Sequence, residues 1–182
     1  MAGRNNKILG EKRRQFVLRW LKESDEPITA STLAERANVS RQVIVQDISL
    51  LKARNHPIVA TSQGYVYMDK ALAEKRPTCI VAVRHLPEET EDELNIMVDH
   101  GVFVRDVIVE HPVYGEITAS LMLRNRRDVS RFIERVKETN AAYLLELTAG
   151  LHLHTLEAES TDQLDEVCQA LDKAGYLVSS SS

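Results

Sequence analysis

Cysteine and glycine are scarce in this 182-residue sequence, and long apolar runs are missing from it. The two cysteines, Cys79 and Cys168, lack the spacing of a zinc knuckle, so we expect reduced, buried thiols rather than a disulfide framework. No run of about 18 apolar residues occurs, and no membrane span is expected. The first residues, MAGRNNK, are polar and do not resemble a signal peptide. These absences predict a cytoplasmic protein with no membrane partner.

Charge divides the chain into two unequal halves, although the whole sequence is acidic with a formal net charge of −4. Residues 1–76 carry 14 Lys and Arg against 8 Asp and Glu, a net of +6, and residues 77–182 carry 9 against 19, a net of −10. An apolar content of 43% is enough for two modest cores. We therefore expect domains at 1–70 and 77–178, joined by a linker at 69–78, and only the basic domain should contact phosphate.

The basic half contains the signals of a winged helix-turn-helix in the required order. Apolar residues at helical spacing predict three helices, with Ser31 as the N-cap of the second and Ser40 as the N-cap of the third. Two short apolar runs joined by TSQG predict the hairpin of a wing. The expected helices and strands cover residues 11–22, 32–37, 41–53, 57–60 and 65–68.

Polar side chains line the exposed start of the third helix, where a recognition helix carries its base-reading residues. Arg41 can bond guanine in two places, and Gln42 or Gln46 can do the same with adenine. Ser40 and the free N–H groups of the first turn can hold a phosphate, and Gln63 lies at the tip of the wing. Five basic residues near the N-terminus either extend this surface or are simply solvated: Arg4, Lys7, Lys12, Arg13 and Arg14.

From Cys79 onward, segments of strand and helix type follow the order β-α-β-β-α-β-α-β. Amphipathic spacing predicts helices at 87–100, 128–139 and 161–174, and two apolar runs flank a possible turn at 148–150. This order predicts an α+β fold, an α/β sandwich whose mostly antiparallel sheet carries helices on one face. The expected strands and apolar runs cover residues 79–85, 101–111, 115–124, 142–147, 151–158 and 176–178.

Three histidines give the acidic half its chemical signal. His152 and His154 lie two residues apart on an expected strand, so both rings point to the same face. His85 ends another expected strand. Three imidazoles and one carboxylate could bind a divalent transition metal such as Zn, Ni or Fe. The alternative for an isolated H-x-H pair is two ordinary strand residues.

The carboxylate that would complete such a site stays open at this point. Glu91 and Glu93 both border the apolar stripe of the helix that follows His85. Glu93 also has a purely structural alternative, as the third helical residue of a capping box that begins at Thr90. Periodicity therefore does not choose between them.

A second candidate site lies between two expected strands, in the string EHPVYGEI. Pro112 disfavours a helical conformation at His111, and Gly115 permits a tight turn. His111 and Tyr114 could then line a ligand pocket beside the metal. The alternative is a turn that is merely held by their hydrogen bonds.

These segments together resemble a known family. The first 70 residues are similar to the winged helix-turn-helix of many bacterial regulators, including biotin repressors, and residues 79–178 resemble the three-histidine (3H) domain. The combination resembles the NiaR niacin-responsive repressors of NAD biosynthesis and niacin uptake. The resemblance to the 3H domain is carried by Arg84-His85, the segment DVIVEHPVYGEI at 106–117 and GLHLHT at 150–155.

The resemblance implies specific site residues and an effector. In the family a metal is held by a histidine at the end of the first strand, a glutamate on the next helix and both histidines of the H-x-H pair. By motif these are His85, Glu93, His152 and His154, with Glu91 or Glu89 as fallbacks for the glutamate. The resemblance also implies nicotinic acid, or nicotinamide, as a co-repressor that tightens operator binding.

The leading interpretation is a homodimeric repressor that binds a palindromic operator, with residues 77–182 forming the dimer. One alternative makes the metal ion itself the signal, and another is a metal-dependent hydrolase. A ligase that also represses would need a Gly- and Arg-rich nucleotide loop, which the seven glycines of this chain do not form. We therefore expect no enzymatic activity.

Overall fold

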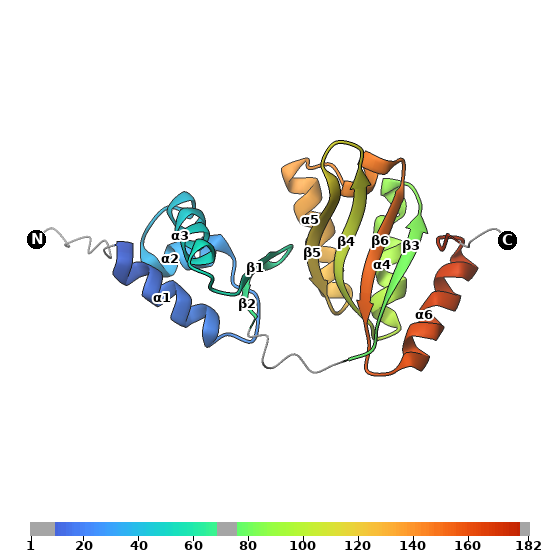
Figure 1. The fold of residues 1–182 in the computed structure, drawn as a ribbon, viewed down its shortest axis with the longest axis horizontal. Coiled ribbons are helices and arrows are strands. Elements are labelled where there is room, and N and C mark those ends of the chain that lie inside the picture. The colour runs from blue at the N-terminus through green and yellow to red at the C-terminus, as the bar shows by residue number, and fades with distance from the viewer. Residues whose placement is uncertain (1–9, 69–75, 179–182) are drawn as a thin grey trace, which may run out of the picture. The chain divides into compact units, whose positions relative to one another are not determined.

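The computed structural model describes residues 10–68 and 76–178 (Figure 1). The chain divides into two units, Met1–Ala73 and Glu74–Ser182. Arg4, Lys7 and most of the expected linker, residues 69–75, lie outside the described residues. Among the helices that are described, none is long and apolar enough to cross a membrane.

The first unit is three helices followed by a two-stranded hairpin. Ser40 caps α3 as expected, since its side chain accepts a hydrogen bond from the N–H of Val43 at 3.4 Å. The N-cap of α2 is Thr29 and not the expected Ser31; the Thr29 hydroxyl accepts from the N–H of Thr32 at 3.1 Å, and α2 begins earlier than predicted. The elements are α1 Gly10–Lys22, α2 Ala30–Ala37, α3 Arg41–Ala53, β1 Ile58–Thr61 and β2 Gly64–Tyr67.

The wing is attached to the helices by a backbone bridge. Tyr65 of β2 pairs with Ile28, and the two residues exchange N–H···O bonds of 3.0 and 2.9 Å. Gly64 precedes this bridge with φ 139°, and a Cβ there would lie 2.7 Å from the Ile28 backbone. Only glycine fits this close approach, so the TSQG turn sets both the hairpin and its contact with the helical core.

A buried ion pair joins α1 to α3. Asp47 of α3 accepts from Arg13 Nε at 2.5 Å and from Arg14 at 3.3 Å, and both Asp47 and Arg13 are buried. Arg14 also pairs with the exposed Glu11 at 2.5 Å. The expectation that Arg13 and Arg14 extend a phosphate-binding surface is therefore wrong, because both guanidinium groups are engaged inside the unit.

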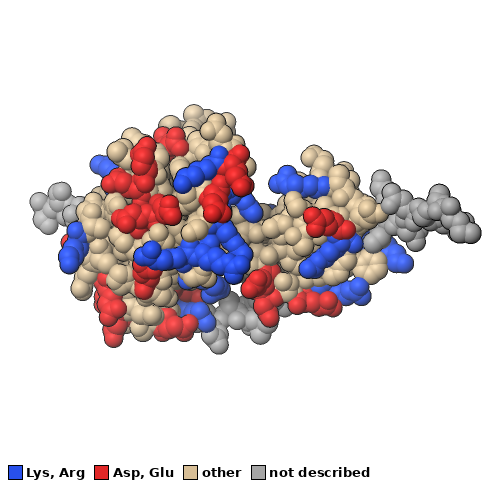
Figure 2. All heavy atoms as spheres, turned by 180° about the vertical axis from the view of Figure 1, so that it is seen from behind, with Lys and Arg blue, Asp and Glu red and all other residues tan. Residues whose placement is uncertain are grey.

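The surface charges are mixed. Arg54 pairs with Glu11 in the first unit, and Arg126 pairs with Asp99 in the second. On the face shown in Figure 2, basic and acidic side chains lie among one another on both units. The difference in net charge between the two halves therefore does not produce a single-sign surface on this face.

The second unit is a four-stranded sheet with the order β3-β6-β4-β5, and every pairing in it is antiparallel. Figure 1 shows α4 and α5 on one face of the sheet, which confirms the predicted architecture, while α6 packs against α4 and β3. Between the sheet and the helices lies an apolar core with Val83, Leu94, Met97, Leu123 and Leu156 at its centre. The elements are β3 Thr78–Arg84, η2 Pro87–Glu89, α4 Thr90–Asp99, β4 Phe103–His111, β5 Gly115–Leu123, α5 Arg126–Thr139, η3 Leu144–Thr148, β6 Leu151–Glu157 and α6 Thr161–Ala174.

Two expected strand segments have other structures. The run at 142–147 lies mostly in the 3-10 helix η3, which ends at the left-handed residue Ala149. The segment at 176–178 forms only an isolated bridge between Leu177 and Val83. Cys79 and Cys168 are free thiols, and both are half-buried where burial was expected. Burial and the neighbouring Cys168 raise the pKa of Cys79 to about 11.

Candidate metal centre and nucleic-acid interface

Four side chains predicted from the sequence meet between the sheet and α4. His152 and His154 lie on β6 opposite Val83 and Val81 of β3, and His85 follows the end of β3. Glu93 lies one turn into α4 and is 0% exposed. The three histidines are also buried, at 2–6% exposure. Strand alternation therefore directs the two β6 rings toward the helix that carries the carboxylate.

The polar atoms of these side chains converge on the Glu93 carboxylate. His85 Nε2 lies 3.1 Å from Oε2, while His154 Nε2 and His152 Nε2 lie 3.3 and 3.7 Å from Oε1. Three potential ligand atoms, one from each of His85, Glu93 and His152, all lie within 4.8 Å of one another. The rings are packed edge to face, at 4.9 Å between the centroids of His152 and each of the other two.

Each ring is oriented by the main chain. The Nδ1 atoms of His85, His152 and His154 lie 2.8, 2.9 and 2.6 Å from the carbonyl oxygens of Leu86, Gly150 and Asp106. A carbonyl oxygen only accepts, so each Nδ1 carries a proton and donates it. In a neutral ring the Nε2 atom is then a lone-pair acceptor that points at Glu93, which is the arrangement found at metal-ligating histidines.

This arrangement fits a cation. An ionised carboxylate and three neutral Nε2 atoms are all acceptors, and no donor lies among them. Both Glu93 oxygens, His85 Nε2 and His154 Nε2 are buried without a hydrogen-bond partner among the described residues. Such unpaired acceptors are costly unless a positive charge is shared between them. A divalent transition metal suits a set of three imidazoles and one carboxylate.

The closeness of the Glu93 carboxylate to the imidazole rings also shifts the pKa values of these groups. Burial opposes ionisation of Glu93, but the adjacent His154 and the other two imidazoles hold its pKa well below its usual range. Burial likewise opposes protonation of His85 and His154, yet Glu93 raises the pKa of both rings. The carboxylate therefore stays charged, and the site attracts protons when no other cation is present.

Two neighbouring residues hold the centre in place. Gly150 has φ +89°, and a Cβ there would overlap the His85 carbonyl oxygen, so only glycine lets η3 and β6 approach His85. Tyr176 packs its ring against His85 at 5.3 Å between centroids and donates its hydroxyl proton to Asp92 at 2.8 Å. Burial and Asp92 raise the pKa of Tyr176 to about 12, so the hydroxyl remains a donor.

The other carboxylates considered from the sequence lie elsewhere. Glu91 is exposed, and Glu89 accepts a hydrogen bond from the N–H of Leu86 at 2.9 Å, which stabilises the turn before α4. The alternative role of Glu93 in a capping box that begins at Thr90 is not seen, because Glu93 points into the imidazole cluster and Thr90 is already the first helical residue.

His111 and Tyr114 lie at the β4–β5 turn. His111 Nδ1 accepts from the N–H groups of Val113 and Tyr114 at 3.2 and 3.3 Å, and the two rings lie 5.0 Å apart. Tyr114 is 78% exposed. These contacts are those of a turn, and neither residue is among those that line the cavity beside the imidazole cluster.

That cavity was not predicted from the sequence. It encloses about 220 Å³ between the sheet, α4, α5 and η3, and His152 and His154 form part of its wall. Its apolar walls include Leu94, Val107 and Phe132. Amphipathic spacing identifies such residues only as inward-facing, and whether they fill a core or line a cavity depends on packing between elements.

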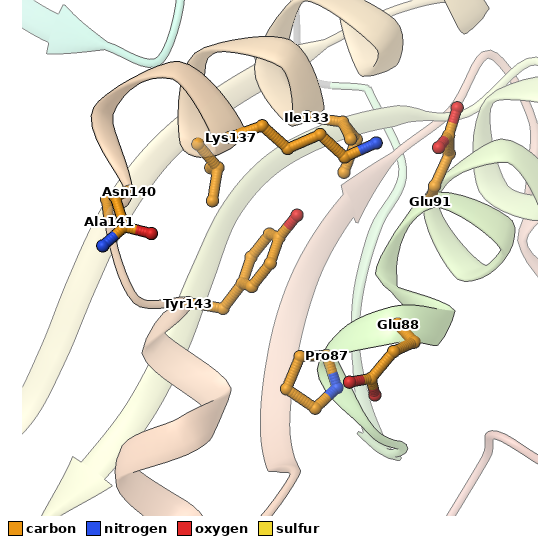
Figure 3. A pocket seen from close by; sticks show the side chains of 9 residues that line it. Pro87, Glu88, Glu91, Ile133, Lys137, Asn140, Ala141 and Tyr143 are labelled. Atoms are coloured by element: carbon orange, nitrogen blue, oxygen red, sulfur yellow. The ribbon is translucent and has the colours of Figure 1, made fainter.

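A groove of about 310 Å³ lies next to the cavity and shares Val136, Ala141 and Tyr143 with it. Figure 3 shows the Tyr143 ring pointing into this groove, with Lys137 of α5 extending above the ring toward Glu91 of α4. Tyr143 also makes an edge contact with Phe132, at 6.2 Å between centroids. These shared side chains form the boundary between groove and cavity.

The predicted DNA-reading residues lie on the outside of the first unit. Arg41, Gln42 and Gln46 are exposed in the first two turns of α3, and Ser40 caps the helix. Gln63 is half-buried in the turn of the wing, where its N–H donates to Thr61 Oγ1 at 3.1 Å. The base-reading candidates are therefore accessible, and the buried ion pair of Asp47 lies on the opposite side of the same helix.

Fold and residues together define a two-domain transcription regulator. An HTH domain model matches residues 13–66, and a 3H domain model matches residues 78–180. The chain is 56% identical over 173 residues to the transcription repressor NadR of Bacillus subtilis, covering 94% of this chain and 96% of that protein. It is 40% identical over 172 residues to the probable transcription repressor NiaR of Thermotoga maritima, covering 94% and 97%. The chain belongs to this NadR/NiaR family of transcription repressors and is a regulator, not an enzyme.

Proposed function

We propose that the protein represses genes of NAD biosynthesis or niacin uptake, with nicotinic acid or nicotinamide as its co-repressor. The N-terminal domain would bind operator DNA, and a divalent transition metal would occupy the centre formed by His85, Glu93, His152 and His154. The observation that carries this proposal is the convergence of three Nε2 acceptors on a fully buried carboxylate with no donor among them.

The side chains present would hold such an ion through the three Nε2 atoms and a Glu93 oxygen. When bound, the ion would supply a positive charge and an open coordination position for a carboxylate or a ring nitrogen of the effector. The role of the protein is to fix the ligand orientation: the carbonyls of Leu86, Gly150 and Asp106 keep all three imidazoles in the tautomer that a metal needs.

On the DNA side, Arg41, Gln42 and Gln46 would read bases while Ser40 and the first N–H groups of α3 contact phosphate. Gln63 would approach the DNA from the wing. One recognition helix reads too few base pairs to specify an operator, so two copies of the chain would bind half-sites about one helical turn apart.

The dimer would form through the second domain. Its sheet carries helices on one face only, and Ile80 of β3 and Leu151 of β6 are 62% and 37% exposed. Light scattering at micromolar concentration on residues 77–182 should give the mass of a dimer. A monomeric 77–182 fragment together with a dimeric 1–76 fragment would show that the dimer forms through the DNA-binding domain instead.

The proposed function is tested by DNA binding with and without each ligand. The operator is first selected by the metal-loaded protein from random duplexes, and its affinity is then measured by fluorescence anisotropy. We expect nicotinate to tighten operator binding by the loaded protein and to have no effect on the double variant His152→Ala, His154→Ala. Operator affinity that is indifferent to both nicotinate and nicotinamide would exclude a niacin co-repressor.

A second candidate is a repressor for which the metal itself is the signal. Three imidazoles and one carboxylate can fill all four positions of a tetrahedral ion, as closed structural sites do, and the centre is buried. In that case adding the ion alone would tighten operator binding, and nicotinate would add nothing.

A further inference from the structure

A bulge in β4 lies beside one of the three histidines. The regular pairing of β4 with β6 is interrupted between Val104 and Ile108. Three residues of β4, 105–107, lie there opposite two of β6, His154 and Thr155. An extra residue of this kind disrupts the ladder of main-chain hydrogen bonds. The main-chain groups of both strands therefore need other partners at this point.

Asp106 supplies two different acceptors at this interruption. Its main-chain carbonyl accepts the Nδ1 proton of His154 at 2.6 Å. Its carboxylate oxygen Oδ1 accepts the main-chain N–H of Thr155 at 3.1 Å. In a regular antiparallel ladder, that N–H would be bonded to a main-chain carbonyl of the neighbouring strand. The Asp106 side chain therefore replaces a ladder carbonyl, while the carbonyl of the same residue binds an imidazole ring.

The bond to the carbonyl determines which nitrogen of His154 can bind a cation. A proton held on Nδ1 leaves Nε2 with the lone pair, and Nε2 lies 3.3 Å from the Glu93 carboxylate. Asp106 and Thr155 are both half-buried, so a Thr155 N–H without an acceptor would be unfavourable. Removing the Asp106 carboxylate would therefore make the Thr155 N–H and the His154 ring compete for one carbonyl.

We propose that Asp106 is a positioning residue of the metal centre, because its carboxylate holds the Thr155 N–H and so reserves the Asp106 carbonyl for His154. Without the carboxylate, the main chain of β4 would shift to bring this carbonyl to the Thr155 N–H, and the ring would lose the bond that fixes its tautomer. The inference rests on the proposed function for the metal centre. It adds a residue that acts through His154 by accepting a hydrogen bond, and this task does not require a negative charge.

The test is cobalt(II) binding by the metal-free full-length chain, measured by visible absorption in competition with a chelator. Asp106→Ala should bind cobalt roughly 10- to 100-fold more weakly than the wild type, as is typical when the outer partner of a metal-ligating histidine is lost. Asp106→Asn keeps an acceptor oxygen for the Thr155 N–H and should bind like the wild type. Asp162→Ala removes the same charge at an exposed position in the first turn of α6 and should also bind like the wild type.

A double-mutant cycle separates positioning from a general loss of stability. In His154→Ala the ring is absent, so adding Asp106→Ala should cause no further loss of cobalt affinity. Equal losses with and without the ring would refute the role of Asp106. If His154→Ala binds too little cobalt to measure, the absorption bands of cobalt-loaded Asp106→Ala decide: they should differ from those of the wild type, and unchanged bands would refute the role.

The outcomes also separate this inference from its premise. If the wild type and Asp106→Ala bind cobalt equally well, the role of Asp106 is refuted while the metal centre stands. If the wild type binds neither cobalt, zinc nor nickel, both are refuted. A loss in Asp106→Asn as large as in Asp106→Ala would overturn the requirement for an acceptor. If Asp106→Ala does not fold, Asp106→Ser replaces it, since its hydroxyl lies one bond closer to the main chain than Oδ1, and the same loss is expected.

Discussion

Substitution of Asp47 by alanine should destabilise the DNA-binding domain far more than its position on the recognition helix suggests. Asp47 is 2% exposed and is bonded to Arg13, which is 8% exposed, with Arg14 as a third partner at 3.3 Å. Asp47→Ala removes the carboxylate that pairs with the buried Arg13 guanidinium. Breaking a buried ion pair in this way costs about 3–5 kcal/mol.

This loss is large because the whole free energy of unfolding of a small domain is only about 5–15 kcal/mol. The contacts also predict which single substitution lowers the free energy of unfolding more. Arg13→Ala should cost less than Asp47→Ala, because Asp47 would keep Arg14. The double variant Arg13→Met, Asp47→Leu should regain most of the loss, since it removes both buried charges and keeps the packing volume.

Urea unfolding followed by tryptophan fluorescence measures this domain by itself. Trp20 is the sole tryptophan of the chain, lies on α1 and packs against the core of the first unit. Arg54→Ala is the matched control, because its ion pair with Glu11 is exposed and should contribute little. If Asp47→Ala unfolds at the same urea concentration as Arg54→Ala, the buried pair does not stabilise the domain and the reasoning fails.

Three further predictions concern the metal centre and the DNA interface. Gly150→Ala should lose bound metal, because the new methyl group would displace the His85 backbone; a metal content equal to wild type, measured by elemental analysis, would contradict this. Metal affinity should fall as the pH is lowered, because Glu93 raises the pKa of His85 and His154, so that protons compete for the rings from a higher pH than for free imidazole, whose pKa is about 6.5. Metal titrations at neutral and mildly acidic pH check this, and a pH-independent affinity would exclude imidazole ligation. Arg41→Ala and Gln42→Ala should each cost about 1–3 kcal/mol on the selected operator if they read bases, and equal losses on random DNA would reassign both to phosphate contacts.

The regular part of the fold could be predicted because local signals and packing agree. Helical spacing identified the six α-helices found within residues 10–68 and 76–178, and Gly101 and Gly175, both with positive φ, mark helix ends as expected. The H-x-H spacing alone directs His152 and His154 to one face, as the structure shows. Choosing Glu93 over Glu91 needed the family resemblance, because one turn of helix brings both carboxylates to the border of the same apolar stripe.

The rest depends on contacts between segments far apart in the chain. Asp47 is a charged residue in an amphipathic helix, and only the position of Arg13, 34 residues earlier, shows that it is buried. The run at 142–147 has the apolar composition of a strand, but most of it forms η3, which ends at the left-handed residue Ala149 just before β6. The burial of Thr90 gives no sequence signal either, since a threonine at the start of a helix usually caps it.

The register of the sheet has a further consequence for the histidine rings. The pairing of β4 shifts between Val104 and Asp106 on one side and between Val104 and Ile108 on the other, and the Asp106 carbonyl at this bulge accepts the His154 proton. The other two rings are likewise anchored to backbone carbonyls, so the main chain holds the Nδ1 atom of all three rings. Point substitutions in the surroundings therefore remove none of these anchors unless they move the main chain. Side chains in the walls of the neighbouring cavity can therefore vary while the three rings keep their backbone anchors.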